Sequence, residues 1–315
     1  MTRKSLVDIV ESLDPKDAPE GGFVASRISQ DSQVRLGRGR SCIALLVPAV
    51  PESASEPDLR LENLRVTHFA RCSVLDGSES LSGEFGIIEC TSEDAGVRGT
   101  FLDVLEWLVP GSGDLTTPEA KELFGRVIRL LSPSDAPSRT SALGLWGELF
   151  IMGLSDDISA WARAWHITPR DRWDFAFRDE RVEVKTSSGA RRHHFSLDQL
   201  ACPPGVETLV ISLVTTPSSS GPTIRELLQR LVLQVDTEVR DRLIETAIAS
   251  LGDSWTSGSE SRFDDRLASD SVRVFASHRI PQVAPPPPEV SEVRFVVDLT
   301  DVEPTGGLES VRGMT

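Results

Sequence analysis

The first third of the chain alternates short apolar runs with polar, turn-forming stretches. Helical spacing of apolar residues appears at Arg98–Leu108 and at Pro118–Leu131, where Thr117 is the expected N-cap and Pro118 the first helical residue. The pattern predicts a strand-rich N-terminal α+β domain over residues 1–132. Its expected strands are the β-branched or aromatic runs Cys42–Val47, Leu64–Phe69 and Phe85–Cys90.

The middle of the chain, residues 139–250, has the pattern of an α/β domain. A nearly all-apolar helix is expected at 140–154, with Thr140 or Ser141 as its N-cap. Capping-box patterns at Ser196–Gln199 and Thr223–Glu226 indicate where two later helices begin. The remaining expected elements are strands at 173–178, 181–187, 192–196 and 206–214, and helices at 197–202 and 223–233.

The C-terminal region, residues 251–315, predicts a short β extension. Strand-like runs at Ser271–Ala276 and Val293–Leu299 lie on either side of four prolines, Pro285–Pro288, which favour an extended spacer. The tail after Pro304 is expected to be frayed. The loop-forming composition of residues 131–138 predicts a linker between the first two domains.

Composition predicts a cytoplasmic protein that does not span a membrane. No apolar run reaches the ~18–20 residues that span a bilayer, and no secretory signal is evident. The four cysteines are far apart without a CxxC pair, which favours reduced thiols over a zinc cluster or disulfides. With 33 basic and 48 acidic residues among 315, the net charge is −15, so the surface as a whole should repel nucleic acid.

Positive charge is nevertheless concentrated in one window. Residues 160–200 carry a net charge of +2, and the rest of the chain carries −17. Phosphate contacts from cationic side chains would supply affinity for nucleic acid and make it salt-dependent. The alternative is a solvated loop with unpaired charges. The candidates for phosphate contacts are Arg170, Arg191, Arg192 and His193.

Glu148 is the only polar side chain in the apolar helix, between Ala142 and Leu154. A carboxylate in a buried helix costs several kcal/mol unless it is paired or bound to a cation. It therefore either reaches solvent, pairs with an arginine or binds a metal ion.

Two alternating segments, residues 173–177 and 182–185, flank a polar turn and predict a β-hairpin. With Asp179-Glu180 as the turn, Asp174 pairs with Lys185, and the small Ala176 pairs with Glu183. Because side chains alternate across a strand, these residues share one face, opposite the apolar ones. An exposed hairpin with cross-strand salt bridges is the alternative. Lys185 is one of only four lysines among the 33 basic residues.

Two carboxylates and an ammonium in this arrangement suit phosphodiester hydrolysis. Asp174 and Glu183 would hold Mg²⁺, for which Mn²⁺ can substitute, since these ions take oxygen ligands. Lys185 would orient the attacking water and offset charge in the transition state. Glu148, from the preceding helix, would be a further ligand or would bind a second metal ion.

Four segments together resemble the PD-(D/E)XK nucleases. They are Gly-Glu at 147–148, Trp-Asp-Phe at 173–175, Glu-Val-Lys-Thr at 183–186, and the His-x-Phe-Ser…Gln-Leu stretch from 193 to 200. More narrowly, they resemble a bacterial group of PD-(D/E)XK motif proteins encoded beside restriction–modification or phage-defence genes. The resemblance covers residues 140–232 and departs from the family pattern at Trp173, where the family has proline.

This resemblance implies a restriction-endonuclease-like αβββαβ core, with a mixed sheet flanked by helices. It makes Asp174 and Glu183 the metal ligands, Lys185 the catalytic lysine and Glu148 the helix carboxylate. Gln199 either supports these residues or contacts substrate, or it only caps a helix.

The sequence therefore predicts a Mg²⁺-dependent DNA endonuclease of a bacterial restriction or defence system. Protein partners from the same operon are expected, and a homodimer is one possible assembly. A catalytically silent DNA-binding or scaffolding subunit is the alternative, and RNA or a nucleotide as substrate is a third reading.

Overall fold

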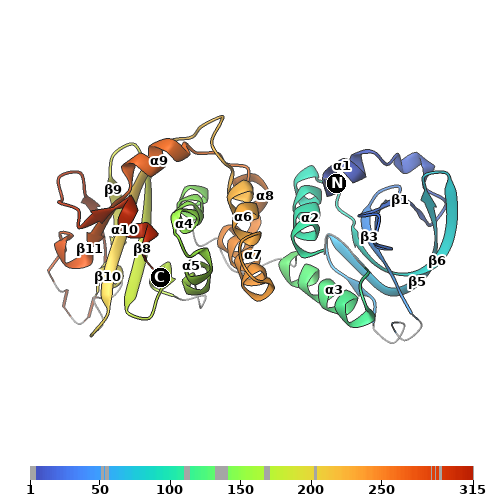
Figure 1. Cartoon of the computed structure of the whole chain (residues 1–315), viewed down its shortest axis with the longest axis horizontal. Helices are drawn as coiled ribbons and strands as arrows, with labels where there is room; N and C mark the ends of the chain where they lie inside the picture. Colours follow the sequence, from blue (N-terminus) through green and yellow to red (C-terminus); the bar gives the residue numbers. More distant parts are fainter. Residues whose placement is uncertain are drawn as a thin grey trace. The chain divides into compact units, whose positions relative to one another are not determined.

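The computed structural model shows a mixed α/β protein with two compact units, Met1–Pro133 and Ser134–Thr315 (Figure 1). It describes residues 5–50, 53, 57–109, 114–131, 141–166, 171–201, 204–284, 286–287, 289–290 and 293–314. The predicted linker therefore lies almost entirely outside the described residues, as do two of the four prolines in the predicted spacer. None of the described helices is both long and apolar enough to cross a membrane.

The first unit is a small β-barrel with helices packed on it (Figure 1). Its sheet has the order β1-β2-β3-β6-β5-β4, and a parallel pairing of β1 with β5 closes five of these strands into the barrel. The strands are β1 (Phe23–Arg27), β2 (Arg35–Arg38), β3 (Ile43–Pro48), β4 (Leu59–Arg60), β5 (Leu64–Asp76) and β6 (Glu79–Cys90). The helices are α1 (Leu6–Glu11), α2 (Ala95–Leu108) and α3 (Thr117–Leu131), with a 3-10 turn at Pro15–Asp17.

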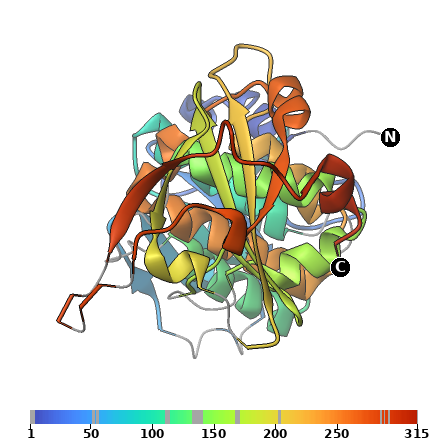
Figure 2. The ribbon, with the colours of Figure 1, turned by 90° about the vertical axis from the view of Figure 1, so that its left-hand side faces the viewer.

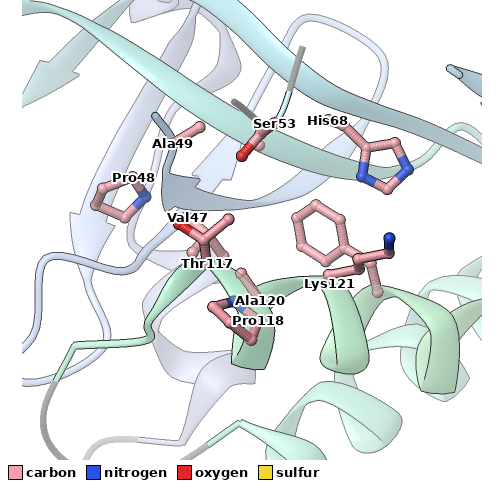
Figure 3. A pocket seen from close by; sticks show the side chains of 11 residues that line it. Val47, Pro48, Ala49, Ser53, His68, Thr117, Pro118, Ala120 and Lys121 are labelled. Carbon is pink, nitrogen blue, oxygen red and sulfur yellow. The ribbon is translucent and has the colours of Figure 1, made fainter. Parts of the chain in front are cut away.

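The interior of the barrel is filled by apolar side chains that alternate along the strands, among them Phe23, Leu46 and Phe85. A pocket of about 280 Å³ lies between the barrel and α3 (Figure 3). His68 and Phe124 lie on its wall with ring centroids 5.8 Å apart.

The apolar runs predicted as strands in this unit are β3, the start of β5 and the end of β6. The pattern missed α1, β1 and β2. The expected N-cap at Thr117 is wrong by one residue, because the backbone N–H and hydroxyl of Thr116 both donate to Glu119 (2.8 and 2.7 Å). These contacts make Thr116, one residue before Thr117, the N-cap of α3.

The second unit has a five-stranded mixed sheet of order β13-β11-β10-β8-β7 and a separate two-stranded ribbon of β9 and β12. The strands are β7 (Phe175–Ala176), β8 (Glu180–Ser188), β9 (Arg192–Ser196), β10 (Glu207–Thr215), β11 (Arg273–Ala276), β12 (Arg294–Asp298) and β13 (Gly306–Gly307). The helices are α4 (Ala142–Leu154), α5 (Ile158–Ala164), α6 (Ile224–Val232), α7 (Thr237–Leu251), α8 (Trp255–Gly258), α9 (Asp265–Ser271) and α10 (Leu308–Arg312), with the 3-10 helix η3 (Leu197–Leu200).

Helix α4 is apolar all round because it lies between two layers, the sheet on one side and α6 on the other (Figure 1). The Ser141 side chain caps its start by accepting from Gly144 N (3.1 Å). The predicted capping boxes are also present: Ser196 with Gln199 begins η3, and Thr223 with Glu226 begins α6. The N-cap hydrogen bonds thus start these helices where the sequence predicts.

The other face of the sheet is covered by the β9–β12 ribbon and η3. Phe195 and Val297 from the ribbon form one apolar cluster with Val210 and Phe275 from the sheet. Figure 2 looks onto this face, with the red C-terminal segments across the green and yellow strands. Val210 lies beside Glu183 in the β8–β10 register, so the side chain of Glu183 points to this face.

The prediction of a frayed tail after Pro304 is wrong. Gly306 and Gly307 form β13 against β11, and α10 follows with Val311 fully buried. The Trp161 indole N–H donates to the carbonyl of Met314 (3.2 Å). The tail is ordered because apolar burial and backbone pairing attach it to the second unit.

Contact between α4 and β8 depends on Gly147. An added Cβ at this position would overlap Thr186 Oγ1, and rotating that hydroxyl away would still leave Thr186 Cβ at 3.0 Å. The absence of a side chain therefore lets α4 approach β8 closely and brings the next residue, Glu148, to the edge of the sheet.

We expect Gly147→Ala to lower the free energy of unfolding by about 1–3 kcal/mol, because the methyl group overpacks the α4–β8 contact. Gly153→Ala in the same helix is the matched control, since its Cβ would meet only Leu231 Cδ2, at 3.8 Å. The control should be neutral or stabilising by up to about 1 kcal/mol. Urea unfolding of both variants measures the difference, and equal effects would contradict this account of Gly147.

Candidate functional site

Glu183 and Lys185 lie two residues apart on β8 and point to the face covered by β9 and η3. Lys185 Nζ lies 2.7 Å from Glu183 Oε1 and 5.3 Å from the centre of the Phe195 ring. Both side chains are shielded from water, with 18% of Lys185 and 3% of Glu183 exposed. The pair is therefore held in a largely dry environment.

Asp174 precedes the two-residue strand β7, which leaves the edge of β8 open beyond Phe175. One carboxylate oxygen of Asp174 accepts a hydrogen bond from the backbone N–H of Val184 (2.7 Å). The carboxylate thus lies at the free edge of β8, where it can be reached from both faces of the sheet.

The predicted hairpin register is wrong by two residues. Phe175 pairs with Val182, and Ala176 pairs with Arg181 instead of Glu183. The turn is formed by Arg178-Asp179, closed by a hydrogen bond from Phe177 N to Glu180 O (3.0 Å). A shift of two residues keeps every side chain on its predicted face, because strand side chains repeat with period two.

Glu148 approaches the same place from α4. It is 4% exposed, and its Oε2 accepts a hydrogen bond from the indole N–H of Trp165 (2.8 Å). His166 Nε2 lies 3.1 Å from the same oxygen. The sequence left open whether this carboxylate reaches solvent, pairs with an arginine or binds a metal ion. In the described part of the chain its hydrogen-bond partners are an indole and an imidazole.

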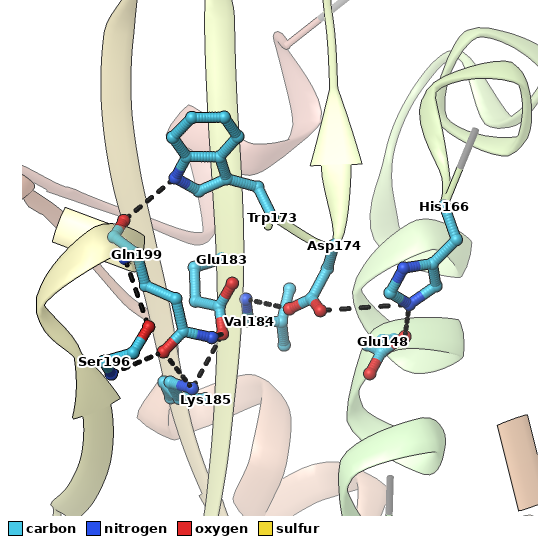
Figure 4. Close-up of polar contacts among 9 residues, drawn as sticks. All are labelled: Glu148, His166, Trp173, Asp174, Glu183, Val184, Lys185, Ser196 and Gln199. Carbon is cyan, nitrogen blue, oxygen red and sulfur yellow. Dashed lines mark hydrogen bonds and ion pairs between the residues drawn. The ribbon is translucent and has the colours of Figure 1, made fainter. Parts of the chain in front are cut away.

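His166, like its neighbour Trp165, is a residue of this site that the sequence analysis did not single out. Its backbone N–H donates to Asp174 O (2.9 Å), and its Nε2 lies 3.9 Å from Asp174 Oδ1 (Figure 4). Trp165 next to it forms an isolated β-bridge with Phe175. This pairing between distant segments has no local signature, so spacing along the chain could not have found His166.

Gln199 joins the other side of the site. Its Oε1 accepts from Ser196 N (3.0 Å) as part of the capping box and lies 3.4 Å from Lys185 Nζ, while its Nε2 donates to Glu183 Oε1. Gln199 therefore caps η3 and also contacts Glu183 and Lys185. Trp173, which stands where the family has proline, donates from its indole to Gln199 O (2.9 Å).

Burial and neighbouring charges raise the pKa values of two of these carboxyl groups, Asp174 and Glu183. Burial, followed by the charges of Glu183 and Glu148, raises the pKa of Asp174 well above its ordinary value. Burial also raises the pKa of Glu183, although Lys185 acts in the opposite direction. Burial alone would lower the pKa of His166, but the hydrogen bond and charge of Glu148 outweigh it, so that pKa is raised. The cluster favours bound cations.

The donor set fits a divalent metal ion. Glu183 Oε2 is buried and has no hydrogen-bond partner among the described residues, which is costly for a carboxylate oxygen without a cation. Glu148, His166 and Asp174 each offer one ligand atom, and these atoms lie within 4.8 Å of one another. Carboxylate oxygens with one imidazole can hold such an ion at this edge of β8.

Arg191 and His193, predicted as nucleic-acid contacts on the surface, are instead buried. The Arg191 guanidinium donates to the carbonyl and hydroxyl of Ser212 (both 2.8 Å) and to Ser271 O (2.6 Å). Burial lowers the pKa of Arg191 to about 10, and it lowers the pKa of His193 to about 3, so this imidazole is neutral. His193 lies 2.6 Å from the Ser212 hydroxyl. The alternation of β9 turns both side chains inward.

Arg192 lies between these two residues and is exposed, opposite Asp298 in the β9–β12 ribbon. Arg170 lies outside the described residues. Of the four predicted phosphate contacts, only Arg192 is therefore seen to be accessible in the described part of the chain.

The sequence matches the model of one protein family over residues 13–300. That family is described as "Putative PD-(D/E)XK family member, (DUF4420)". A search of curated proteins and a search of solved structures each returned no match. The match covers both compact units, so the barrel and the sheet with the carboxylates belong to one family architecture.

Truncation of the neighbours Arg191 and Arg192 should change the free energy of unfolding by very different amounts. Arg191→Ala is expected to lower the free energy of unfolding by about 2–4 kcal/mol, because buried acceptors lose a charged donor. Arg192→Ala, the matched control on the exposed side of the strand, should change it by less than about 0.5 kcal/mol. Urea unfolding measures both, and a stable Arg191→Ala protein would show that the buried network is dispensable.

Asp174→Asn should stabilise the metal-free protein at pH 8 by roughly 1–3 kcal/mol, because the amide keeps the bond from Val184 N and removes a buried charge. Since the folded-state pKa of Asp174 is raised, its contribution to stability is present at low pH and is lost as pH rises through that pKa. The gain should therefore be smaller at pH 4 than at pH 8. Thermal unfolding in EDTA, with the exposed Asp301→Asn as control, measures it. A loss of stability at pH 8 would contradict the repulsion described here.

Proposed function

Because the chain belongs to the DUF4420 family of PD-(D/E)XK proteins, we propose that it is a metal-dependent nuclease that hydrolyses phosphodiester bonds in DNA. Family membership supports a nuclease-like function. The observation that carries the finer proposal is the arrangement of Asp174, Glu183 and Lys185 about one edge of β8, with an unpartnered buried oxygen on Glu183.

The order of elements supports a restriction-endonuclease-like core. Helices α4 and α5 are followed by β7, β8, β9, the 3-10 helix η3, β10 and α6, and the two long strands β8 and β10 are parallel. We assign residues 139–250 to this core, residues 1–132 to a separate N-terminal domain, and residues 251–315 to a C-terminal extension whose β11 and β13 continue the sheet.

Asp174 and Glu183 would hold the metal ion, Mg²⁺ or its substitute Mn²⁺, with Glu148 as a further ligand. When bound, this ion polarises the scissile phosphate and lowers the pKa of the attacking water. The residues of the chain orient the reactants around it.

Lys185 is the residue that we assign to the attacking water. Its ammonium lies between Glu183 Oε1 and Gln199 Oε1, which fix its position on the β9 side of the sheet. From there it can orient a water molecule and offset the negative charge that develops on the phosphate. Gln199 acts through Lys185 and Glu183, and it is itself held by the capping box and by Trp173.

The charge distribution supports a DNA substrate that a partner protein brings to the site. The net charge of −15 repels a polyanion at long range, and the burial of Arg191 and His193 leaves a smaller cationic surface around the site. We assign phosphate contact to Arg192 and to Arg170. We therefore propose that the protein acts in the cytoplasm beside partner proteins of a restriction or phage-defence system.

Lys185→Ala should reduce Mg²⁺-dependent or Mn²⁺-dependent cleavage of supercoiled plasmid by about 100-fold or more, because water orientation and charge compensation are lost together. Lys16→Ala, at an exposed lysine of the N-terminal unit, is the matched control and should leave cleavage unchanged. Gel analysis of plasmid and phage DNA, with RNA in parallel, measures the activity.

Cleavage by the Lys185→Ala protein at the wild-type rate would show that the assignment of the lysine is wrong. Binding of DNA by the wild type without cleavage in either metal would favour the catalytically silent subunit. Cleavage of RNA but not of DNA would show that the substrate is RNA.

A further inference from the structure

His166 lies where an imidazole would complete a metal site. Its Nε2 points to two carboxylates at once, at 3.1 Å from Glu148 Oε2 and 3.9 Å from Asp174 Oδ1 (Figure 4). The three residues come from three separate segments: α4, the end of the α5 region and the entry to β7. Their convergence is therefore a product of tertiary structure.

The separations match those of ligands that share one ion. Two ligand atoms that are each about 2.1 Å from a divalent metal lie about 3.0 Å apart at a right angle and about 4.2 Å apart when opposite. Both distances from His166 Nε2 fall in this interval. An ion in place of the Nε2 proton would therefore need only small adjustments of the side chains.

A second observation near this cluster also indicates a cation. Glu183 Oε2 is buried and has no hydrogen-bond partner in the part of the chain that the structure describes, while Oε1 of the same carboxylate faces Lys185 and Gln199. Figure 4 shows the second oxygen directed away from Lys185, on the side of Trp173 and Asp174. Asp174 therefore has an unsatisfied carboxylate on one side and the Glu148–His166 pair on the other.

We propose that Glu148, His166 and Asp174 form a second metal subsite beside that of Asp174 and Glu183, and that His166 makes it selective for a divalent transition-metal ion over Mg²⁺. The inference rests on the proposed function only in that Asp174 is shared between the two subsites. Mg²⁺ takes oxygen ligands, whereas imidazole nitrogen is a good ligand for first-row transition metals. One imidazole among carboxylates therefore shifts the preference of this subsite.

The alternative is that His166 only pairs with Glu148 and holds no metal. In that case the imidazole would satisfy a buried carboxylate, as the indole of Trp165 does. The two readings differ in one measurable property, which is whether an imidazole nitrogen is bonded to the ion.

Mn²⁺ is the probe, because its electron spin reports directly on bonded nitrogen. One equivalent of Mn²⁺ is added to the full chain labelled with ¹⁵N-histidine, and electron spin-echo envelope modulation is recorded. We expect modulation from one imidazole nitrogen in the wild type and its loss in His166→Asn. Asparagine suits this position because the backbone φ of His166 is +37°, which asparagine tolerates better than most residues.

Affinity gives the second readout. His166→Asn should weaken Mn²⁺ binding by about 10- to 100-fold and Mg²⁺ binding by less than about threefold, so the Mn²⁺/Mg²⁺ ratio falls. Glu148→Gln should weaken binding of both ions. His194→Asn, at an exposed histidine of β9, is the matched control and should change neither.

A wild-type spectrum without nitrogen modulation would overturn the inference whether or not the variants fold. So would modulation that persists in His166→Asn, or an unchanged Mn²⁺/Mg²⁺ ratio. The proposed function is tested separately by Lys185→Ala. If the protein binds Mn²⁺ through His166 but does not cleave nucleic acid, this inference holds and the nuclease assignment is wrong. If it cleaves nucleic acid but does not bind Mn²⁺ through His166, the nuclease assignment holds and this inference is wrong.

Discussion

Mutual repulsion among three buried carboxylates is the constraint on which the second unit depends. Glu148 and Glu183 are almost fully buried, and Asp174 lies between the segments that carry them. Charges of one sign in such a setting are costly unless donors or cations compensate for them. The indole of Trp165, the imidazole of His166 and the ammonium of Lys185 supply part of that compensation. The unpartnered oxygen of Glu183 marks the part that is still missing, where we place a metal ion.

The surrounding fold holds these groups in place. Gly147 allows α4 to approach β8, and the shortness of β7 leaves the edge of β8 accessible to Asp174. The capping box of η3 fixes Gln199, whose amide then reaches both Glu183 and Lys185. A hydrogen bond that begins a helix thereby also orients the residues of the site. The side-chain amide of Gln199 therefore both caps η3 and contacts the candidate catalytic residues.

The burial of Arg191 and His193 changes how the charge of the chain should be read. Both count toward the cationic window in the sequence, yet their polar atoms bond to Ser212 and Ser271 inside the unit. These bonds connect β9 and the residue before it to β10 and to the end of α9. The accessible positive charge near the site is consequently smaller than a count of residues indicates, which increases the need for a partner that brings the substrate.

The sequence by itself determined α4, β8, β9, η3, β10 and α6 of the second unit, because apolar periodicity and capping residues act within a few positions. It also determined which face of β8 carries Glu183 and Lys185, since alternation along a strand survives even a register error of two residues. The four segments that contain Glu148, Asp174, Glu183 with Lys185, and Gln199 were together sufficient for the family to be identified.

Tertiary structure alone decided the rest. The turn at Arg178-Asp179, the inward side of β9 and the order of the C-terminal tail follow from packing against distant segments. His166 joins the carboxylates only because Trp165 pairs with Phe175 across the fold. Such contacts depend on which surfaces meet in three dimensions, and a one-dimensional pattern of polar and apolar residues does not encode that choice.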